Sequence, residues 1–510
     1  MDIDDVFREI GELGRHQKKI FLAVALLNGY IAFHNLNTVF IGAKPAFSCL
    51  TADGSVVVNT CDLECKTFEY SHEFTSIATE WHLICGDAYK ISLVQSVYMF
   101  GVLIGALLFG IISDKYGRFW TVMYTTVGLT IASFLSSFPY NLEMYFALRF
   151  MTGFHCGGAI LVSFVLLTEL VGSSKRALCG MLMQLFFAVG IMVFALFAYF
   201  IREWKTLSAV TAAIGTFNSL LIYWFVPESP RWCLIQGKVQ QAEKILESIA
   251  KKNGAKLTEI KLSPPAKSHE GQKYSMVDLW KHKLLRKRTI IQIYAWFVNS
   301  AVYYGLTMSA GSLGSSMYIS VALSGAVEWP AYLLTIVLLS RIGRRSILCS
   351  YMVLGGLCCI GVMMFPAVYS KTITTLAMMG KLTIAASFAV IYVYSAELFP
   401  TVIRNVAMGL TSVAARTGGI MSPLIIALID IHRTLPYLVY GSLAFTAGLL
   451  CIMLPETFGQ PMPETFDDIL DEDTMKKTDK KGKKLISEDR VKLLQDKVDE
   501  HNEFDQVYHV

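Results

Sequence analysis

The chain has 510 residues and a formal net charge of +5; 54% of its residues are hydrophobic and only 17% are charged. A soluble domain usually carries about 25% charged residues, so this composition excludes an ordinary water-soluble globular protein. The modest and widely spread positive charge gives no indication of nucleic-acid binding.

The apolar residues form blocks that are long enough to cross a bilayer. A helix needs about 20 apolar residues to span about 30 Å of hydrocarbon, and lipid offers its backbone no outside hydrogen-bond partner. The sequence therefore predicts an all-α membrane protein with twelve transmembrane helices. They are expected at 19–41, 92–113, 119–137, 142–170, 177–200, 206–226, 289–310, 316–340, 346–366, 372–396, 405–429 and 435–454.

Polar segments divide the predicted spans into two groups of six. Lys and Arg gather in short loops on one side of the spans, and the positive-inside rule makes that side cytosolic. We therefore expect both termini and the middle segment to be cytosolic. The expected parts are an N-terminus at 1–18, a first six-helix bundle at 19–226, a linker at 227–288, a second bundle at 289–454 and a tail at 455–510.

The polar segment at 43–91 lies outside the cell in this orientation, and it contains four of the eleven cysteines. An even number of cysteines in an oxidising compartment predicts two disulfide bonds, and three pairings are possible. The four residues are Cys49, Cys61, Cys65 and Cys85.

Landmarks that follow the second, fourth and sixth spans recur in order after the eighth, tenth and twelfth. Gly117 recurs 226 residues later as Gly343, and each glycine allows a tight turn between neighbouring helices. A duplication of this kind is typical of carriers in which two related bundles rock about a central site, and neither a channel nor a receptor needs it.

The charged residues of these repeated loops are candidate gating residues. We expect them to form ion pairs at the cytosolic mouth that break and re-form in each transport cycle; the alternative is that they only anchor helix ends at the membrane surface. They are Asp114, Arg118, Glu169, Arg176, Glu228 and Arg231 in the first half, and Arg341, Arg344, Arg345, Glu397, Arg404 and Glu456 in the second.

Ionisable side chains within predicted spans are candidate substrate contacts, because each costs about 2.5–3.5 kcal/mol to insert. Glu328 is expected to pair with an ammonium group or with a basic residue across the cavity, or else to support a helix break beside a proline. Arg416 suits a carboxylate. Lys381 is either a second anion contact or a side chain that reaches the interface. His34, beside Asn35, either lines the cavity or packs as a hydrogen-bonded histidine.

Several motifs resemble the major facilitator superfamily, and within it the solute carrier 22 family. A Gly-x-x-x-Asp-Lys-x-Gly-Arg loop occupies 110–118, and an Arg-x-x-x-Gly-x-x-x-Gly pattern begins at Arg149, which we add to the gating residues. The runs at 303–311 and 380–388 are similar to the member-15 branch of that family. The resemblance implies the major facilitator fold, with two pseudo-symmetric six-helix bundles, and transport of organic cations, anions or zwitterions.

The resemblance also implies further substrate contacts. Tyr303 and Tyr304 on the seventh span match positions associated with substrate, as do Gln184 and Phe187 on the fifth. Aromatic faces attract ammonium groups. The cation carriers of the family have a lysine where Gly157 aligns, which predicts that part of their charged site is missing here.

An acidic Glu328 and a basic Arg416 in one cavity suit a molecule that carries both charges. The leading hypothesis is an alternating-access carrier of zwitterions or cations such as carnitine or ergothioneine, in the plasma membrane. The alternatives are an organic anion exchanger, favoured by Arg416 and Lys381, and a receptor or sensor of the same fold that does not transport.

The sequence shows no nucleophile–base arrangement, metal cluster or P-loop, so neither an enzyme nor a cofactor is expected. Coupling to Na⁺ or H⁺ remains open. The last residues, 508–510, resemble a ligand of PDZ domains.

Overall fold

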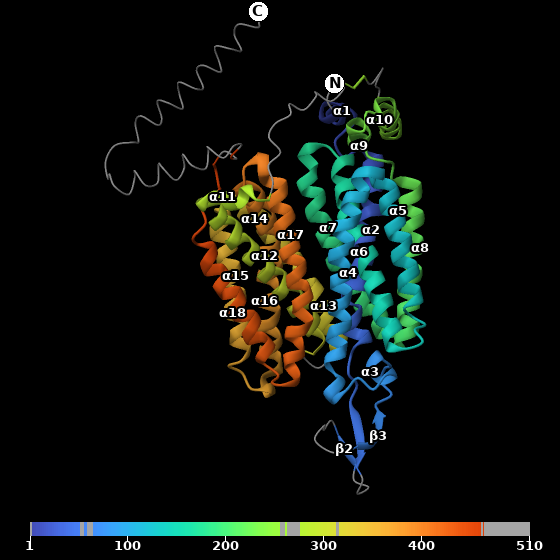
Figure 1. Cartoon of the computed structure of the whole chain (residues 1–510), viewed down its shortest axis with the longest axis vertical. Helices are drawn as coiled ribbons and strands as arrows, with labels where there is room; N and C mark the ends of the chain where they lie inside the picture. Colours follow the sequence, from blue (N-terminus) through green and yellow to red (C-terminus); the bar gives the residue numbers. More distant parts are fainter. Residues whose placement is uncertain are drawn as a thin grey trace, which may run out of the picture.

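The computed structural model describes residues 3–51, 56–58, 65–255, 261–262, 276–312, 316–460 and 463. Figure 1 shows two bundles of long helices side by side, with a small sheet at one end and the N-terminal helix α1 (Ile3–Ile10) at the other. These two ends are called the sheet end and the α1 end below.

Six long helices form the first bundle, and short elements connect and cover them. The long helices are α2 (Arg15–Ile41), α4 (Tyr89–Tyr116), α5 (Arg118–Leu135), α6 (Leu142–Leu170), α7 (Arg176–Phe200) and α8 (Trp204–Phe225). The short elements are α3 (Ile77–Glu80), η1 (Cys85–Asp87), η2 (Ser173–Lys175), α9 (Pro230–Ile235) and α10 (Val239–Asn253).

The second bundle also consists of six spans, one of which is interrupted at Val327. Its helices are α12 (Lys283–Ser309), α13 (Met317–Ala326) with α14 (Glu328–Leu339), α15 (Arg344–Val362), α16 (Ser370–Leu398), α17 (Thr401–Ile426) and α18 (Leu435–Cys451). The short helices are α11 (Asp278–Lys281), η3 (Ala310–Ser312), η4 (Ala367–Tyr369) and η5 (Ala427–Asp430).

Nine helical segments of the described chain are both long and apolar enough to cross a membrane by themselves. The other three spans are α5, with 18 residues, α18, with 17 residues, and α12, which begins with a basic run. The helices confirm the expected architecture, although α12 begins six residues before the predicted start at 289.

The first long loop contains a sheet, which the all-α prediction did not include. Strand β1 (Phe47–Thr51) pairs antiparallel with β2 (Val56–Val58) on one side and with β3 (Cys65–Tyr70) on the other. Cys49 and Cys85 each take part in a disulfide bond. Cys61 and the side chain of Cys65 lie outside the described part, so the predicted pairing stays open.

Helices α4 and α6 pack with their backbones in contact. A Cβ atom added at Gly105 would lie 1.8 Å from the carbonyl oxygen of Phe154, and one at Gly153 would lie 2.0 Å from that of Tyr98. Glycines four residues apart are a common means of bringing two membrane helices this close. The Arg-x-x-x-Gly-x-x-x-Gly pattern therefore has a packing role on α6.

The contact at Gly157 changes the interpretation of that residue. A Cβ atom there would lie 2.1 Å from the carbonyl oxygen of Val102 on α4. A lysine at this position would be directed into the backbone of α4 and would force the helices apart. Gly157 therefore has a packing role in this chain, and the missing charge that the resemblance implies stays a prediction.

Helix α1 covers the linker at the α1 end of the first bundle. Its apolar residues Ile3, Val6 and Phe7 are buried, and the side chain of Asn253 on α10 donates a hydrogen bond to the Ile10 carbonyl over 3.1 Å. The N-terminal segment is thus a packed part of this bundle.

Candidate substrate-binding site

A buried carboxylate lies at the interruption of the eighth span. Glu328 begins α14 and is 0% exposed. Its Oε1 accepts a hydrogen bond from the Tyr303 hydroxyl over 2.7 Å and lies 2.9 Å from Lys381 Nζ, while its Oε2 accepts from the Tyr332 hydroxyl over 3.2 Å. A charge in a low-dielectric interior needs this degree of compensation.

The ammonium group of Lys381 completes the arrangement. Its Nζ lies 3.3 Å from the centroid of the Tyr303 ring and donates a hydrogen bond to the Thr307 hydroxyl. Lys381 is 1% exposed, so its amine does not reach the membrane interface, which was one of its two predicted roles. We call Glu328, Lys381, Tyr303, Tyr332 and Thr307 the lysine cluster.

Helical spacing on α12 and α14 builds this cluster. Thr307 follows Tyr303 by four residues, as Tyr332 follows Glu328, and residues at this spacing lie on one face of a helix. The Thr307 hydroxyl also donates to the Tyr303 carbonyl over 2.6 Å, which fixes its orientation. Lys381 enters from α16 and joins the two faces.

Arg416 lies outside the lysine cluster, on α17. Its Nη1 donates to the carbonyl oxygen of Ser412 over 3.3 Å and to the hydroxyl of the same residue. Its Nε is buried and has no hydrogen-bond partner among the described residues. One turn further on, a Cβ atom at Gly419 would lie 3.4 Å from the Tyr304 ring. The expected pairing of Glu328 with a basic residue is made by Lys381, and Arg416 keeps unused donor capacity.

His34 and Asn35 lie in a packed polar layer of the first bundle. His34 is 0% exposed, its Nδ1 lies 3.3 Å from the Ser133 hydroxyl, and its ring meets that of Tyr30 edge-on at 4.6 Å. The Asn35 side chain donates to the Ile31 carbonyl over 3.1 Å. These contacts correspond to the packing interpretation of His34.

Arg149 is separate from the other candidate gating residues. It is 0% exposed, lies 4.5 Å from the centroid of the Tyr98 ring, and donates to the His34 carbonyl over 3.3 Å and the Gln95 side chain over 3.4 Å. It lies seven residues from the sheet end of α6, whereas the gating loops lie at the α1 end. The structure therefore places Arg149 in the polar layer with His34.

Gln184 and Phe187 lie on α7, which faces the second bundle. A Cβ atom at Gly325 of α13 would lie 2.9 Å from the Ala188 carbonyl. Gln184 is exposed and lies one turn before Ala188 on the same helix face, so its side chain is directed toward the second bundle. Phe187 is partly buried against the core.

The gating residues of the first half interact at the α1 end. Arg118 pairs with Asp114 and lies 3.4 Å from Glu169. Glu228 accepts from the backbone N–H groups of Arg118 and Phe119 over 2.8 and 3.0 Å, which stabilises the first turn of α5. The preceding Gly117 has a φ of 112°, a conformation that favours glycine.

The second half repeats these contacts. Arg344 pairs with Glu397 over 3.1 Å, as Arg118 does with Glu169. Glu456 accepts from the backbone N–H groups of Arg345 and Ser346 over 3.3 and 3.4 Å, as Glu228 does in the first half. The sequence repeat therefore reappears as a repeat of interactions, and each of these interactions joins residues of a single bundle.

The remaining gating residues have local partners. Arg404 donates from Nε to the Phe399 carbonyl over 3.4 Å and from Nη2 to the Thr401 hydroxyl over 3.1 Å. Arg341 lies in the turn after α14, where its backbone N–H donates to the Leu338 carbonyl over 3.0 Å.

Asp4 pairs with two of the candidate gating residues, and the sequence did not reveal these contacts. Its Oδ1 lies 3.0 Å from Arg176 and 2.5 Å from Arg231, so α1 connects the first residue of α7 with α9. Both arginines were expected to pair with loop carboxylates. A signal for Asp4 was absent because it has no counterpart in the second half.

Asp4→Asn should lower the stability of the folded carrier by about 1 kcal/mol, since both of its ion pairs are partly exposed to solvent. Asp5→Asn is the matched control, because within the described part of the chain Asp5 pairs with the exposed Arg8 on its own helix. Thermal unfolding of purified protein in detergent would measure both. Equal unfolding midpoints for the two variants would contradict the role of Asp4.

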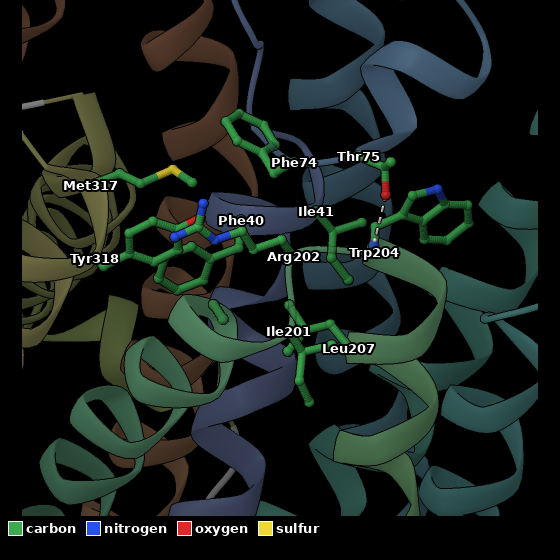
Figure 2. A pocket seen from close by; sticks show the side chains of 11 residues that line it. Phe40, Ile41, Phe74, Thr75, Ile201, Arg202, Trp204, Leu207, Met317 and Tyr318 are labelled. Atoms are coloured by element: carbon green, nitrogen blue, oxygen red, sulfur yellow. Dashed lines mark hydrogen bonds between the residues drawn. The ribbon is translucent and has the colours of Figure 1, made fainter. Parts of the chain in front are cut away.

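At the sheet end the contacts cross between the bundles. The rings of Phe40 on α2 and Tyr318 on α13 lie against each other (Figure 2); they are stacked, and their centroids are 5.7 Å apart. Ser96 donates from α4 to the Ile420 carbonyl of α17 over 2.9 Å, and Lys44 pairs with Asp430 over 2.8 Å. These interactions hold the two bundles together at this end.

The segment after the sheet covers the same region. The backbone N–H of Thr75 donates to the Arg202 carbonyl over 3.0 Å. The Thr75 hydroxyl accepts a hydrogen bond from the backbone N–H of Trp204 (dashed line in Figure 2), and the two atoms are 3.1 Å apart. A small pocket remains beside Phe40 and Tyr318, and it is lined by residues of α2, α7, α8 and α13.

Comparison with known proteins assigns this fold. The sugar (and other) transporter family matches residues 49–467. The partially occluded inward-open structure of the xylose transporter XylE from E. coli covers 88% of this chain and 99% of its own, with a TM-score of 0.61 and 18% identity. The chain is therefore a membrane transporter with the major facilitator fold, as the motifs indicated, and it is not an enzyme.

Similar proteins narrow the assignment further. Solute carrier family 22 member 15-like of Xenopus laevis is 38% identical over 92% of this chain and 96% of its own length. Organic cation transporter protein of Drosophila melanogaster is 36% identical over 92% and 94%, and human organic cation/carnitine transporter 2 is 33% identical over 92% and 94%. The chain belongs to solute carrier family 22.

Proposed function

We propose that this protein is an alternating-access carrier of small organic zwitterions and cations, similar to carnitine or ergothioneine. The observation that carries this proposal is the buried Glu328 carboxylate, which two tyrosine hydroxyls and an ammonium group contact in the middle of the second bundle. A carboxylate beside an aromatic face is the environment that an organic ammonium group prefers.

The carboxylate of a zwitterion would be bound by Arg416. Arg416 lies on α17, a helix that also contacts the first bundle, and its Nε has no partner among the described residues. Charge-assisted hydrogen bonds of this kind contribute about 1.5–3 kcal/mol. The relatives include proteins named for organic cations and for carnitine, which supports the same substrate class.

The carrier is proposed to lie in the plasma membrane, with its α1 end facing the cytosol. The basic loops with Arg118 and Arg344 lie at this end, as the positive-inside rule requires. The sheet, with the disulfide-bonded Cys49 and Cys85, would then be extracellular, where two disulfides among the four loop cysteines are expected. In that orientation the bundles are closed on the outside.

The organic anion exchanger remains a second candidate because Arg416 and Lys381 both lie in the membrane. The contacts of Lys381 oppose it: the amine is already paired with Glu328, which leaves one basic group for an anion. A receptor or sensor without transport is disfavoured by the gating contacts, which are intact in both halves.

Uptake of radiolabelled carnitine, ergothioneine, tetraethylammonium and p-aminohippurate, with and without Na⁺ and at two pH values, tests the proposal. Arg416→Asp should reduce carnitine uptake at least about tenfold, which corresponds to about 1.4 kcal/mol, and should leave tetraethylammonium uptake unchanged or raised. Arg433→Asp, an exposed change at the sheet end, is the control.

The outcomes of this experiment separate the candidates. Selective uptake of p-aminohippurate would replace the proposal with the anion exchanger. Binding of these compounds without uptake of any would support the sensor. An unchanged substrate preference in Arg416→Asp would remove Arg416 from the site.

A further inference from the structure

Within the lysine cluster, the ammonium group of Lys381 occupies the position beside Glu328 where the cationic group of a substrate would bind. Lys381 Nζ lies 2.9 Å from Glu328 Oε1 and 3.3 Å from the centroid of the Tyr303 ring, and it donates to Thr307. A carboxylate, an aromatic face and a hydroxyl are the groups that would surround the ammonium of a substrate. The position for such a group is therefore occupied.

We propose that Lys381 is a tethered competitor for the cation subsite and that it makes the carrier select zwitterions over simple cations. This inference rests on the proposed function and adds the residue that determines specificity. A substrate ammonium can approach Glu328 only when the Lys381 amine moves away, so binding is an exchange of one cation for another.

The exchange has different consequences for different substrates. After a monocation displaces Lys381, the monocation is paired with Glu328. The Lys381 amine and the Arg416 guanidinium are then both without a carboxylate partner. Burying an unpaired charge is strongly unfavourable, because no water compensates for the lost partner. A zwitterion brings a second carboxylate, which Arg416 and the displaced Lys381 amine can bind together, so the number of ion pairs rises.

The side chain of Lys381 has the flexibility that this exchange requires. Its side chain is a flexible four-carbon chain that ends in a point charge, so the amine can leave one partner for another without movement of the backbone. Arginine would be held by a planar, two-pronged contact instead. Glu328, in contrast, is fixed by two tyrosine hydroxyls and stays in place when the amine departs.

Removal of the Lys381 amine should therefore shift the substrate selectivity of the carrier from zwitterions toward simple cations. Lys381→Met is expected to raise the apparent affinity for tetraethylammonium at least about tenfold relative to carnitine, measured as cross-inhibition of uptake and normalised to protein at the cell surface. Lys381→Gln should shift selectivity in the same direction. Lys371→Met, on the exposed sheet end of the same helix, is the matched control and should behave as the wild type.

A double variant protects the test against misfolding. Glu328→Gln combined with Lys381→Met removes both charges of the buried pair and leaves neither without a partner, so this variant should reach the surface. It should show no gain for tetraethylammonium because the carboxylate is absent. A gain in this double variant would overturn the inference, as would unchanged selectivity in both Lys381→Met and Lys381→Gln.

The wild type separates failure of the inference from failure of the proposed function. If the wild type carries neither carnitine nor tetraethylammonium, the proposed function is wrong. If it carries carnitine and the Lys381 variants keep the same preference, Lys381 is only a structural counter-ion of Glu328.

Discussion

Glu328→Ala is expected to abolish uptake of both carnitine and tetraethylammonium and to reduce the amount of folded carrier. The change removes the carboxylate that would bind the substrate ammonium. It also leaves Lys381, which is 1% exposed, without its ion-pair partner. Breaking a buried pair by deleting one partner typically costs about 3–5 kcal/mol, which is a large share of the stability of a folded protein.

Two variants separate the loss of function from the loss of stability. Combining Glu328→Ala with Lys381→Met removes both charges, so surface abundance should recover while uptake of either cation stays absent. Glu143→Ala, which changes an exposed acid near the sheet end, should alter neither property. Surface biotinylation and radiolabelled uptake in the same cells would measure both effects. Normal uptake by Glu328→Ala would show that this carboxylate has no part in transport.

The sequence identified the members of this site more easily than their partners. Glu328, Lys381 and Arg416 were detectable because ionisable groups within apolar spans are costly. Which basic residue pairs with Glu328 depends on how α12, α14 and α16 are rotated about their axes and on the interruption at Val327. Hydrophobic periodicity does not determine those rotations in a helix that is apolar all round, so the pair was not predictable.

The gating contacts show a similar division. Pairs such as Arg118 with Glu169 recur in the second half as Arg344 with Glu397, and the sequence repeat alone indicated them. Asp4 belongs to a short helix with no counterpart in the second half, so duplication could not reveal it.

The sheet of the first long loop and the packing role of Gly157 were missed for local reasons. Strands of five, three and six residues in a polar loop are too short for an alternating pattern to be recognised. At Gly157 an alignment compares positions along a chain, whereas the distance to the Val102 carbonyl depends on how closely two helices approach.

Cross-linking the two bundles at the sheet end is expected to stop transport completely. Phe40 and Tyr318 lie on opposite bundles, and their stacked rings are 5.7 Å apart at an interplanar angle of 9°. Alternating access requires this contact to open in every cycle, because the site at Glu328 must become reachable from that side. A short reagent that joins two cysteine thiols through a reducible linker, applied to Phe40→Cys combined with Tyr318→Cys, should therefore hold the carrier closed at the sheet end.

The design of this test follows from the free cysteines of the described chain. Six of the free cysteines are buried: Cys156, Cys179, Cys233, Cys349, Cys359 and Cys451. Phe40→Cys alone and Tyr318→Cys alone, each treated with the reagent, control for reaction at these residues and at the partly buried Cys358. Uptake should fall only in the double variant and should return after a reducing agent cleaves the linker. If the cross-linked double variant still transports, the bundles do not separate at Phe40 and Tyr318, and substrate must reach Glu328 by a route that leaves the sheet end closed.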